Sequence, residues 1–226
     1  MLSIACASDI HGHWRKLEYP KADILCITGD FLRNYYRNIL EDAQKQLEEF
    51  KLMNEFLGTL DYQEIFIVLG NHERVGIHFL NNMKEILTNG ILLHDEAAKF
   101  GSYSLYGSPW QPAFGVGWAF NLPQFDDLAG YPVAKQTWAK IPDNTNILLT
   151  HTPSYQILDR CEDGRRVGCP ILLERIKQLK DLKINIHGHI HTGYGVEEHD
   201  GVQFVNAALC DDHNRLKNKI RVVTIE

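Results

Sequence analysis

Three histidines recur at alternate positions near the end of the chain, and their side chains are of the kind that binds transition metals. They are His187, His189 and His191. A neutral imidazole offers a lone pair near neutral pH, which makes histidine the commonest ligand of such metals. The apolar run that precedes them predicts a strand, and alternate side chains of a strand share one face. The stretch therefore predicts part of a metal site.

Four other short polar stretches supply further candidate ligands, and each follows a predicted strand. With the histidines, the candidate ligands are Asp9, His11, Asp30, Asn71, His151, His189 and His191. This set mixes oxygen and nitrogen donors and contains no thiolate. It suits Mn, Fe, Zn or Co better than it suits a structural cysteine-bound zinc.

Such a ligand set is typical of a site that holds two divalent metal ions. A carboxylate can bridge two cations about 3.5–4 Å apart, and the pair then clamps both oxygens of an in-line phosphoryl displacement. A hydroxide between the metals is a nucleophile at neutral pH, because the cations lower the pKa of bound water. The alternative, that each histidine only satisfies a hydrogen bond, explains single residues but not five motifs after five strands.

The elements that must position these residues follow from the hydrophobic periodicity. Short apolar runs predict buried strands whose carboxyl ends deliver the polar stretches, as in open α/β sheets. These strands are Leu2–Ala7, Asp23–Thr28, Glu64–Leu69 and Asn146–Leu149. Short strands are expected from Ile91 to Tyr106, and Gln203–Ala207 and Ile220–Ile225 close the chain as strands.

Four stretches are predicted to be helices. They are Arg37–Leu60, Ile77–Leu87, Ala134–Ile141 and Ile171–Leu182. The first two are amphipathic, and in the first the apolar residues recur at spacings of three and four. We interpret the first of them as a packing element rather than a functional one.

The residues from Gly107 to Tyr131 form an irregular stretch rich in glycine, proline and aromatic side chains. Its aromatics include Trp110, Phe114, Trp118, Phe120 and Phe125. A long loop in a compact domain is usually functional or disordered, and this aromatic content argues against disorder. Two interpretations stay open: a wall of the metal site, or a separate structural cluster. An exposed part of it would equally serve as a subunit contact.

Composition limits the classes of function. The 226 residues are enough for one core, so we expect a single domain over residues 1–226. The formal net charge of −6 argues against a partner that is long nucleic acid or a membrane surface.

The five cysteines are odd in number and form no CxxC pair, which indicates a reducing compartment. No apolar run approaches the ~20 residues of a spanning helix, and a strand starting at Leu2 leaves no room for a signal peptide. We expect a cytoplasmic protein, monomeric or homodimeric.

The ordered motifs resemble the signature of the calcineurin-like metallophosphoesterases, over nearly the whole chain. The motifs are Asp9-x-His11, Gly29-Asp30, Gly70-Asn71-His72-Glu73, His151 and Gly188-His189-x-His191. The resemblance implies a four-layer α/β/β/α sandwich of two mixed β-sheets between helices, with a dimetal site at their top edge. One departure is Glu73, which stands where the wider family usually has Asp.

The roles in that family carry over position by position. The resemblance implies a first metal bound by Asp9, His11 and His191, and a second bound by Asn71, His151 and His189. Asp30 would bridge the two metals. His72 would lie near the leaving-group oxygen, as general acid or charge stabiliser. We expect Asn71, His72 and Arg166 to contact the substrate, Arg166 because a guanidinium fits oxyanions bidentately.

Within the family, further stretches resemble the MPPED branch, which is similar to class III cyclic-nucleotide phosphodiesterases. They are 107–110, 117–123, 166–169 and 188–195. Some animal members of that branch have glycine in place of the first histidine of the last motif and are weak enzymes. This chain keeps His189 there, so the resemblance implies a complete second metal site.

The sequence thus predicts a dimetal-dependent phosphodiesterase that hydrolyses cyclic nucleotides or related small diesters by in-line attack of a metal-bridging hydroxide. Two divalent metal ions are the expected cofactors, and we expect Mn²⁺ to support turnover in vitro. Two alternatives stay open. One is a phosphomonoesterase acting on nucleotides, sugar phosphates or phosphoproteins at the same site. The other is a scaffold of low activity that retains the fold.

Overall fold

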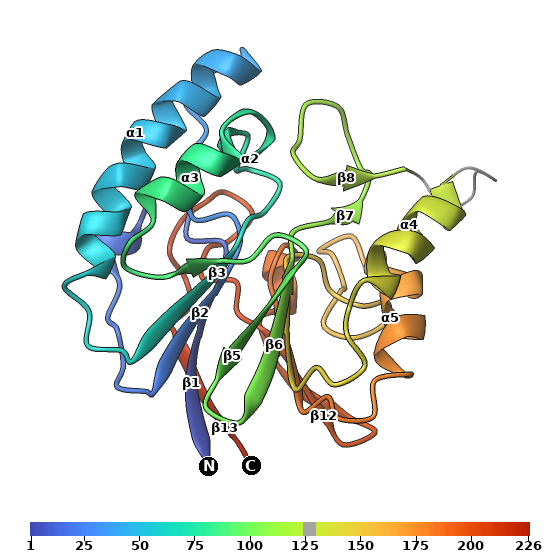
Figure 1. Cartoon of the computed structure of the whole chain (residues 1–226). Coiled ribbons are helices and arrows are strands. Elements are labelled where there is room, and N and C mark those ends of the chain that lie inside the picture. The colour runs from blue at the N-terminus through green and yellow to red at the C-terminus, as the bar shows by residue number, and fades with distance from the viewer. Residues whose placement is uncertain (124–129) are drawn as a thin grey trace.

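Two β-sheets lie face to face, and helices cover the outer face of each sheet (Figure 1). The computed structural model describes residues 1–123 and 130–226. The order of layers is helices, sheet, sheet, helices. This confirms the predicted four-layer α/β/β/α sandwich.

The first sheet has the strand order β13-β1-β2-β3-β4. Four of its strands run parallel: β1 (Leu2–Ala7), β2 (Ile24–Thr28), β3 (Glu64–Val68) and β4 (Ile91–Leu92). The last strand, β13 (Arg221–Ile225), pairs antiparallel with β1. The helices on this side are α1 (Ile39–Leu57), α2 (Val75–His78) and α3 (Leu80–Ile86).

The second sheet has the strand order β11-β12-β10-β9-β6-β5. Its inner strands are parallel: β12 (Val202–Asn206), β10 (Ile184–His187), β9 (Ile147–Thr150) and β6 (Tyr103–Ser108). The edge strands β11 (Gly195–His199) and β5 (Glu96–Phe100) are antiparallel to their neighbours. Helices α4 (Gly130–Ala139) and α5 (Pro170–Ile176) cover this sheet, and β7 (Gln111–Pro112) and β8 (Asn121–Leu122) form a separate ribbon. Two short 3-10 helices complete the elements, η1 (Trp14–Lys16) and η2 (His191–Gly193).

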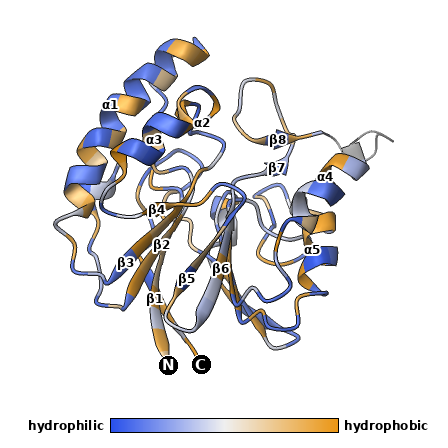
Figure 2. Ribbon diagram, viewed as in Figure 1, coloured by the Kyte–Doolittle hydropathy of each residue, from blue (hydrophilic) through white to orange (hydrophobic). Residues whose placement is uncertain are grey.

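The pleat of each strand distributes apolar side chains between two layers of core. In β2, Ile24 and Cys26 face the second sheet, whereas Leu25 and Ile27 face the helices. Strands that are buried on both faces read as continuous apolar runs, and the central strands are accordingly hydrophobic along their length while the helices alternate (Figure 2).

Three of the predicted helices differ in extent. The helix predicted over Ala134–Ile141 is α4, which begins earlier, at Gly130, and ends at Ala139. The stretch Ile77–Leu87 is broken at Phe79, whose φ of −132° is not helical, so it forms parts of α2 and α3 instead. The stretch Ile171–Leu182 keeps only the short helix α5, which ends at Ile176. The apolar residues beyond it, Leu179 and Leu182, pack into the core from turns, and their spacing of three imitates a helix.

Candidate metal centre

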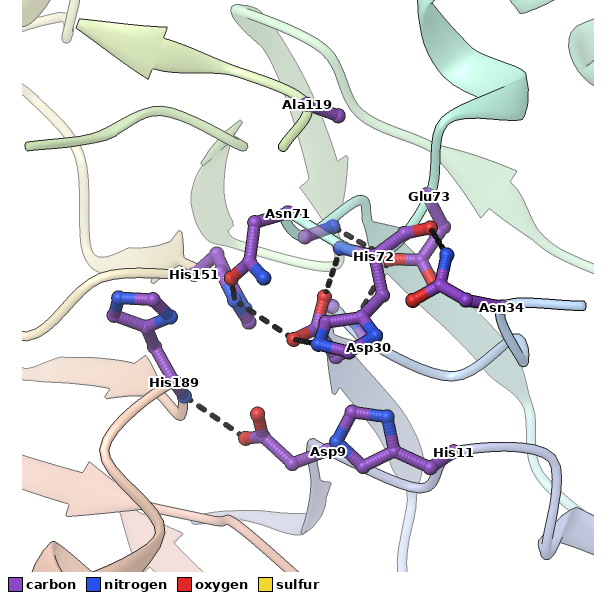
Figure 3. Close-up of polar contacts among 12 residues, drawn as sticks. Asp9, His11, Asp30, Asn34, Asn71, His72, Glu73, Ala119, His151 and His189 are labelled. Atoms are coloured by element: carbon purple, nitrogen blue, oxygen red, sulfur yellow. Dashed lines mark hydrogen bonds and ion pairs between the residues drawn. The ribbon is translucent and has the colours of Figure 1, made fainter. Parts of the chain in front are cut away.

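The candidate ligands come together because parallel strands deliver their carboxyl ends to one edge of the two sheets (Figure 3). β1 is followed by Asp9 and His11, and β2 by Asp30. In the second sheet, β9 is followed by His151 and β10 by the histidine-rich stretch. The sandwich therefore places segments that are far apart in sequence at one site.

A first cluster consists of Asp9, His11 and His191, whose ligand atoms all lie within 4.8 Å of one another. Nε2 of His11 is 3.5 Å from Nε2 of His191, and the latter atom is 3.2 Å from Oδ1 of Asp9. The Asp9 carboxyl is fully buried. Its other oxygen accepts a hydrogen bond from the backbone N–H of His189, 2.9 Å away.

A second cluster consists of Asp30, His151 and His189, and its ligand atoms also lie within 4.8 Å of one another. Nε2 of His151 is 3.4 Å from Oδ2 of Asp30 and 2.9 Å from Oδ1 of Asn71. Nδ1 of His151 is held by the carbonyl oxygen of Thr28 at 2.8 Å. This contact leaves Nε2 as the atom that faces the site.

His72 lies beside Asp30 and His11, and these three residues form another group with converging ligand atoms. Nε2 of His72 is 3.8 Å from Oδ2 of Asp30, and its backbone N–H donates to Oδ1 of Asp30 at 2.7 Å. Burial lowers the pKa of His72, against the opposing effect of the Asp30 carboxylate. The Asp30 carboxylate is thus shared among residues of both clusters and His72.

The donor set fits divalent cations. Burial disfavours a charged carboxylate at position 30, yet the neighbouring His151 and His72 hold the pKa of Asp30 well below its ordinary value. Buried carboxylates are costly unless they are paired with cations or hydrogen-bond donors. The ring nitrogens of His11 and His191 converge on one space with Asp9. Mixed imidazole and carboxylate donors suit Mn, Fe, Zn or Co.

Four of the candidate ligands adopt left-handed backbone conformations. The φ angles are 50° at Asp9, 45° at His11, 52° at Asp30 and 67° at His189. Such conformations are uncommon for residues with a Cβ and cost of order 1 kcal/mol or more each. They gather at this site, where strained residues are commonly functional. The turns aim the side chains that follow each strand into a common space.

Two glycines permit the close approach of these segments. A Cβ on Gly70 would meet a carboxylate oxygen of Asp30, and a Cβ on Gly188 would meet Ser8 and the carboxylate of Asp9. Any other side chain at these positions would displace a ligand. The glycines of the Gly-Asn-His and Gly-His-x-His motifs are therefore required by space.

Glu73 holds the loops after β2 and β3 together. Its Oε2 accepts from the backbone N–H of Asp30 at 2.7 Å and of Gly70 at 2.6 Å, and its Oε1 accepts from Leu32 N–H at 2.9 Å. The side chain thereby fixes the backbone on which the Asp30 carboxylate is mounted. The structure gives Glu73 a positioning role rather than a contact with the ligand clusters.

The expectation that α1 contributes packing alone is incomplete. Its buried residues include Asp42, Gln46 and Glu49, on the same face as the apolar side chains. Gln46 Nε2 donates to the carbonyl oxygen of His72 at 2.7 Å, and Glu49 Oε2 accepts from Arg33 N–H at 3.1 Å. These three polar residues are spaced four and three apart, in step with the apolar residues of the helix, and this spacing indicated that they are buried. The helix supports the loops of the site from behind.

Two predicted features lie differently from expectation. Strand β10 ends at His187, so the three histidines do not share one face. His187 is fully buried, and neither ring nitrogen has a hydrogen-bond partner within the described residues.

The Arg166 guanidinium pairs with the buried Asp159 at 2.8 Å and donates to the Gln156 carbonyl at 2.7 Å. A substrate contact of Arg166 stays a prediction.

Both interpretations of the aromatic stretch hold, for different residues. Trp110 and Phe120 pack against the core on the α1 side. Trp118 lies beside His72, with ring centroids 4.6 Å apart, and Phe114 lies beside His189 at 5.2 Å. Phe125 falls outside the described residues.

Comparisons with known proteins agree with this geometry. The family profile described as calcineurin-like phosphoesterase matches residues 2–193. The chain is 31% identical to metallophosphoesterase domain-containing protein 1 of Homo sapiens over 229 residues, which cover 91% of this chain and 65% of that protein. It is 29% identical to a UPF0046 protein of Caenorhabditis elegans, covering 95% of this chain and 57% of that protein. The chain thus spans less than two thirds of the length of these relatives.

A solved crystal structure matches with a TM-score of 0.65 and 18% identity, covering 90% of this chain and 89% of its own, which shows the fold alone. Among the described residues, no helix has the length and apolarity needed to cross a membrane. The two ligand clusters at the strand ends and the family match over most of the chain lead to one conclusion: this chain belongs to the calcineurin-like phosphoesterase family.

Proposed function

We propose that this protein hydrolyses small phosphodiesters, cyclic nucleotides among them, with the help of two divalent metal ions. The observation that carries the proposal is the pair of ligand clusters, one at Asp9 and one at Asp30, in a phosphoesterase family member. The sequence resemblance to the MPPED branch and to class III cyclic-nucleotide phosphodiesterases supports the choice of diester. The free cysteines support a reducing, cytoplasmic setting.

The protein side chains would hold the metals and orient the phosphoryl group. When bound, two divalent cations polarise the phosphoryl oxygens and supply a nucleophile at neutral pH by lowering the pKa of water. Asp9, His11 and His191 would hold one cation, and the second cluster with Asn71 the other. The Asp30 carboxylate, which adjoins both sets, would bridge the cations and fix their separation.

His72 would serve the leaving group. Its ring lies against Asp30 and at the edge of the clusters, 18% exposed, so its N–H can reach an oxygen of a bound ester. In the resting protein burial lowers the pKa of His72, so the neutral ring would donate a hydrogen bond that stabilises the negative charge developing on the leaving-group oxygen.

His72→Ala tests this role. We expect the variant to keep its metal and to lose turnover by about 10²–10⁴-fold, most on esters with poor leaving groups. Metal content by mass spectrometry and rates across a series of aryl leaving groups measure both effects. Unchanged rates with both clusters loaded would remove His72 from the reaction.

The function itself is tested with a matched pair of chromogenic esters. Metal-stripped protein receives Mn²⁺ and is assayed with bis(4-nitrophenyl) phosphate and with 4-nitrophenyl phosphate. We expect metal-dependent turnover that favours the diester. Preference for the monoester would establish a phosphomonoesterase built on the same residues. If neither ester is cleaved although metal is bound, the phosphoesterase proposal fails and a scaffold takes its place.

A further inference from the structure

Two aromatic side chains of the β7–β8 loop stand directly beside the candidate metal centre. The Phe114 ring is 5.2 Å from the His189 ring, and the Trp118 ring is 4.6 Å from the His72 ring. Phe114 and Trp118 stack on each other, 5.8 Å apart and inclined by 26°. The pair thus extends from the second ligand cluster to the residue assigned to the leaving group. Figure 1 shows the loop that carries the pair rising on the same side of the molecule as α2.

The fold does not use this pair as core. Phe114 is 53% exposed, whereas Phe120 from the same loop is only 7% exposed and packs with the core beneath. Phe114 is continuous with Trp118, and an exposed apolar patch that is rimmed by polar residues marks a ligand-binding or interaction surface. Removal of the half-exposed Phe114 ring would leave almost no buried cavity, so the ring contributes little to the stability of the fold. Stability therefore does not explain an aromatic side chain at this position.

The loop is held in place before any ligand arrives. Arg74 Nε donates to the Gly117 carbonyl at 3.0 Å, and the Ala119 N–H donates to the Asn71 carbonyl at 3.0 Å. Asn121 Nδ2 donates to the Gly115 carbonyl at 3.0 Å. The loop is therefore tied both to itself and to the segment that carries Asn71 and His72. A preformed surface binds without the entropic cost of ordering a loop.

We propose that Phe114 and Trp118 form a stacking platform that selects phosphodiesters bearing a planar aromatic group, such as a nucleobase. The proposal rests on the proposed phosphodiesterase function, and it assigns the specificity of that site to these two side chains. The faces of aromatic rings attract one another in offset stacks, and every nucleobase has such a face. The clusters would bind the phosphate while the platform binds the base.

The test compares two cyclic diesters that share a five-membered phosphate ring and differ in the base. They are adenosine 2′,3′-cyclic phosphate and glycerol 1,2-cyclic phosphate, followed by phosphorus NMR with Mn²⁺-loaded protein. The wild-type protein should prefer the nucleotide. Phe114→Ala should lower kcat/KM for the nucleotide by roughly 5- to 150-fold, the value of one base–aromatic stack, and should leave glycerol cyclic phosphate nearly unchanged.

Conservative variants and a loop control sharpen the result. Phe114→Tyr and Trp118→Phe should retain the preference, since each keeps an aromatic face, and Phe114→Leu should lose it. Val116→Ala is the control, because Val116 is fully exposed at the tip of the same loop and has no assigned role. Equal preference in the wild-type protein and in Phe114→Ala would overturn the proposal.

A binding measurement separates failure of the platform from failure of the proposed function. Calorimetry compares AMP with ribose 5-phosphate, which carries the same phosphate without a base. If neither cyclic diester is cleaved but AMP binds more tightly than ribose 5-phosphate only when Phe114 is present, the platform stands and the hydrolase proposal falls. If Phe114→Ala instead converts a dimer into a monomer by light scattering with the base preference intact, the pair is a subunit contact and the platform is overturned.

Discussion

The two ligand clusters differ in what holds their histidines. In the second cluster, Nδ1 of His151 is bonded to the backbone carbonyl of Thr28, and the whole side chain is buried. In the first cluster, Nδ1 of His191 lies 3.5 Å from the carboxylate of Asp212, a side chain that is 49% exposed. The core thus holds the ring of His151 by a hydrogen bond, whereas the ring of His191 makes no hydrogen bond through Nδ1 to any described residue and only lies near a carboxylate at the surface. Since partners behind a metal ligand tune its affinity, we expect the first cluster to exchange metal more readily and to be easier to alter.

Asp30→Ala removes the carboxylate that both clusters share, so it should erase the difference between them by weakening both. We expect loss of metal from each cluster and a fall in turnover of at least about 10³-fold, in line with the loss of other preorganised electrostatic groups. Metal content and diester turnover measure the effect. Asp61→Ala is the matched control, because Asp61 is exposed and precedes β3, at the opposite end of that strand from the ligand Asn71. Retention of both metals and most of the rate would contradict the bridging role.

His189→Gly should break the second cluster alone. Because His189 has a φ of 67°, glycine at this position introduces no backbone strain, and the effect reports the loss of the imidazole. We expect loss of one of the two metals and about 10²-fold lower turnover. His189→Asn is the comparison, since asparagine tolerates the left-handed conformation and retains an oxygen donor. Full metal content in the glycine variant would refute the assignment of His189.

Protons compete with metal ions for a histidine in each cluster, and we expect this competition to affect both clusters alike. Burial opposes protonation of His151 and His191, but Asp30 and Asp9 respectively raise the pKa of each to about 9 in the metal-free protein. Each histidine therefore holds a proton at pH 7 that a metal must displace. Affinity at each cluster should rise roughly tenfold per pH unit from about pH 7 to 9 and then level off. Calorimetric metal titrations at several pH values, with proton release measured in two buffers, check the slope; affinity that does not change with pH would contradict it.

Asp212→Asn should sharpen the difference between the clusters. The variant keeps the size of the side chain and removes the charge near His191, so the first cluster should lose no more than about tenfold in metal affinity, the low end for such partners. The second cluster should not change. A two-site metal titration resolves the two affinities. Equal weakening of both sites, or none in either, would show that Asp212 does not support His191.

Much of the sandwich was predictable because its strands are buried on both faces. The apolar runs before Asp9, Asp30 and Asn71 form strands of five or six residues, which are too short for most other buried elements. The bounds of β1 agree with the prediction to the residue. The helices were less predictable. Phe79 breaks a stretch whose apolar spacing is helical, because tertiary packing decides its backbone angles.

The types of the ligands were predictable, but their conformations were not. Motif spacing identified Asp9 and His189 as candidates, yet nothing in a single sequence indicates that both adopt positive φ angles. The alternate spacing of His187, His189 and His191 led to a wrong prediction, that the three side chains share one face of a strand. Strand β10 ends at His187, and the chain turns before His189. The position of Gln46 within the apolar face of α1 indicated that it is buried, but its partner was not predictable, because the carbonyl oxygen of His72 lies on a loop that is remote in sequence.

The antiparallel pairing of β13 with β1 has a practical consequence for handling the molecule. Leu2 lies opposite Ile225 in this pairing, so the first and last residues emerge side by side (Figure 1). They do so at the end of the strands remote from the metal centre. A circular permutant that joins the two ends through a short glycine linker should therefore fold. An affinity handle at either end would present the open site away from a solid support.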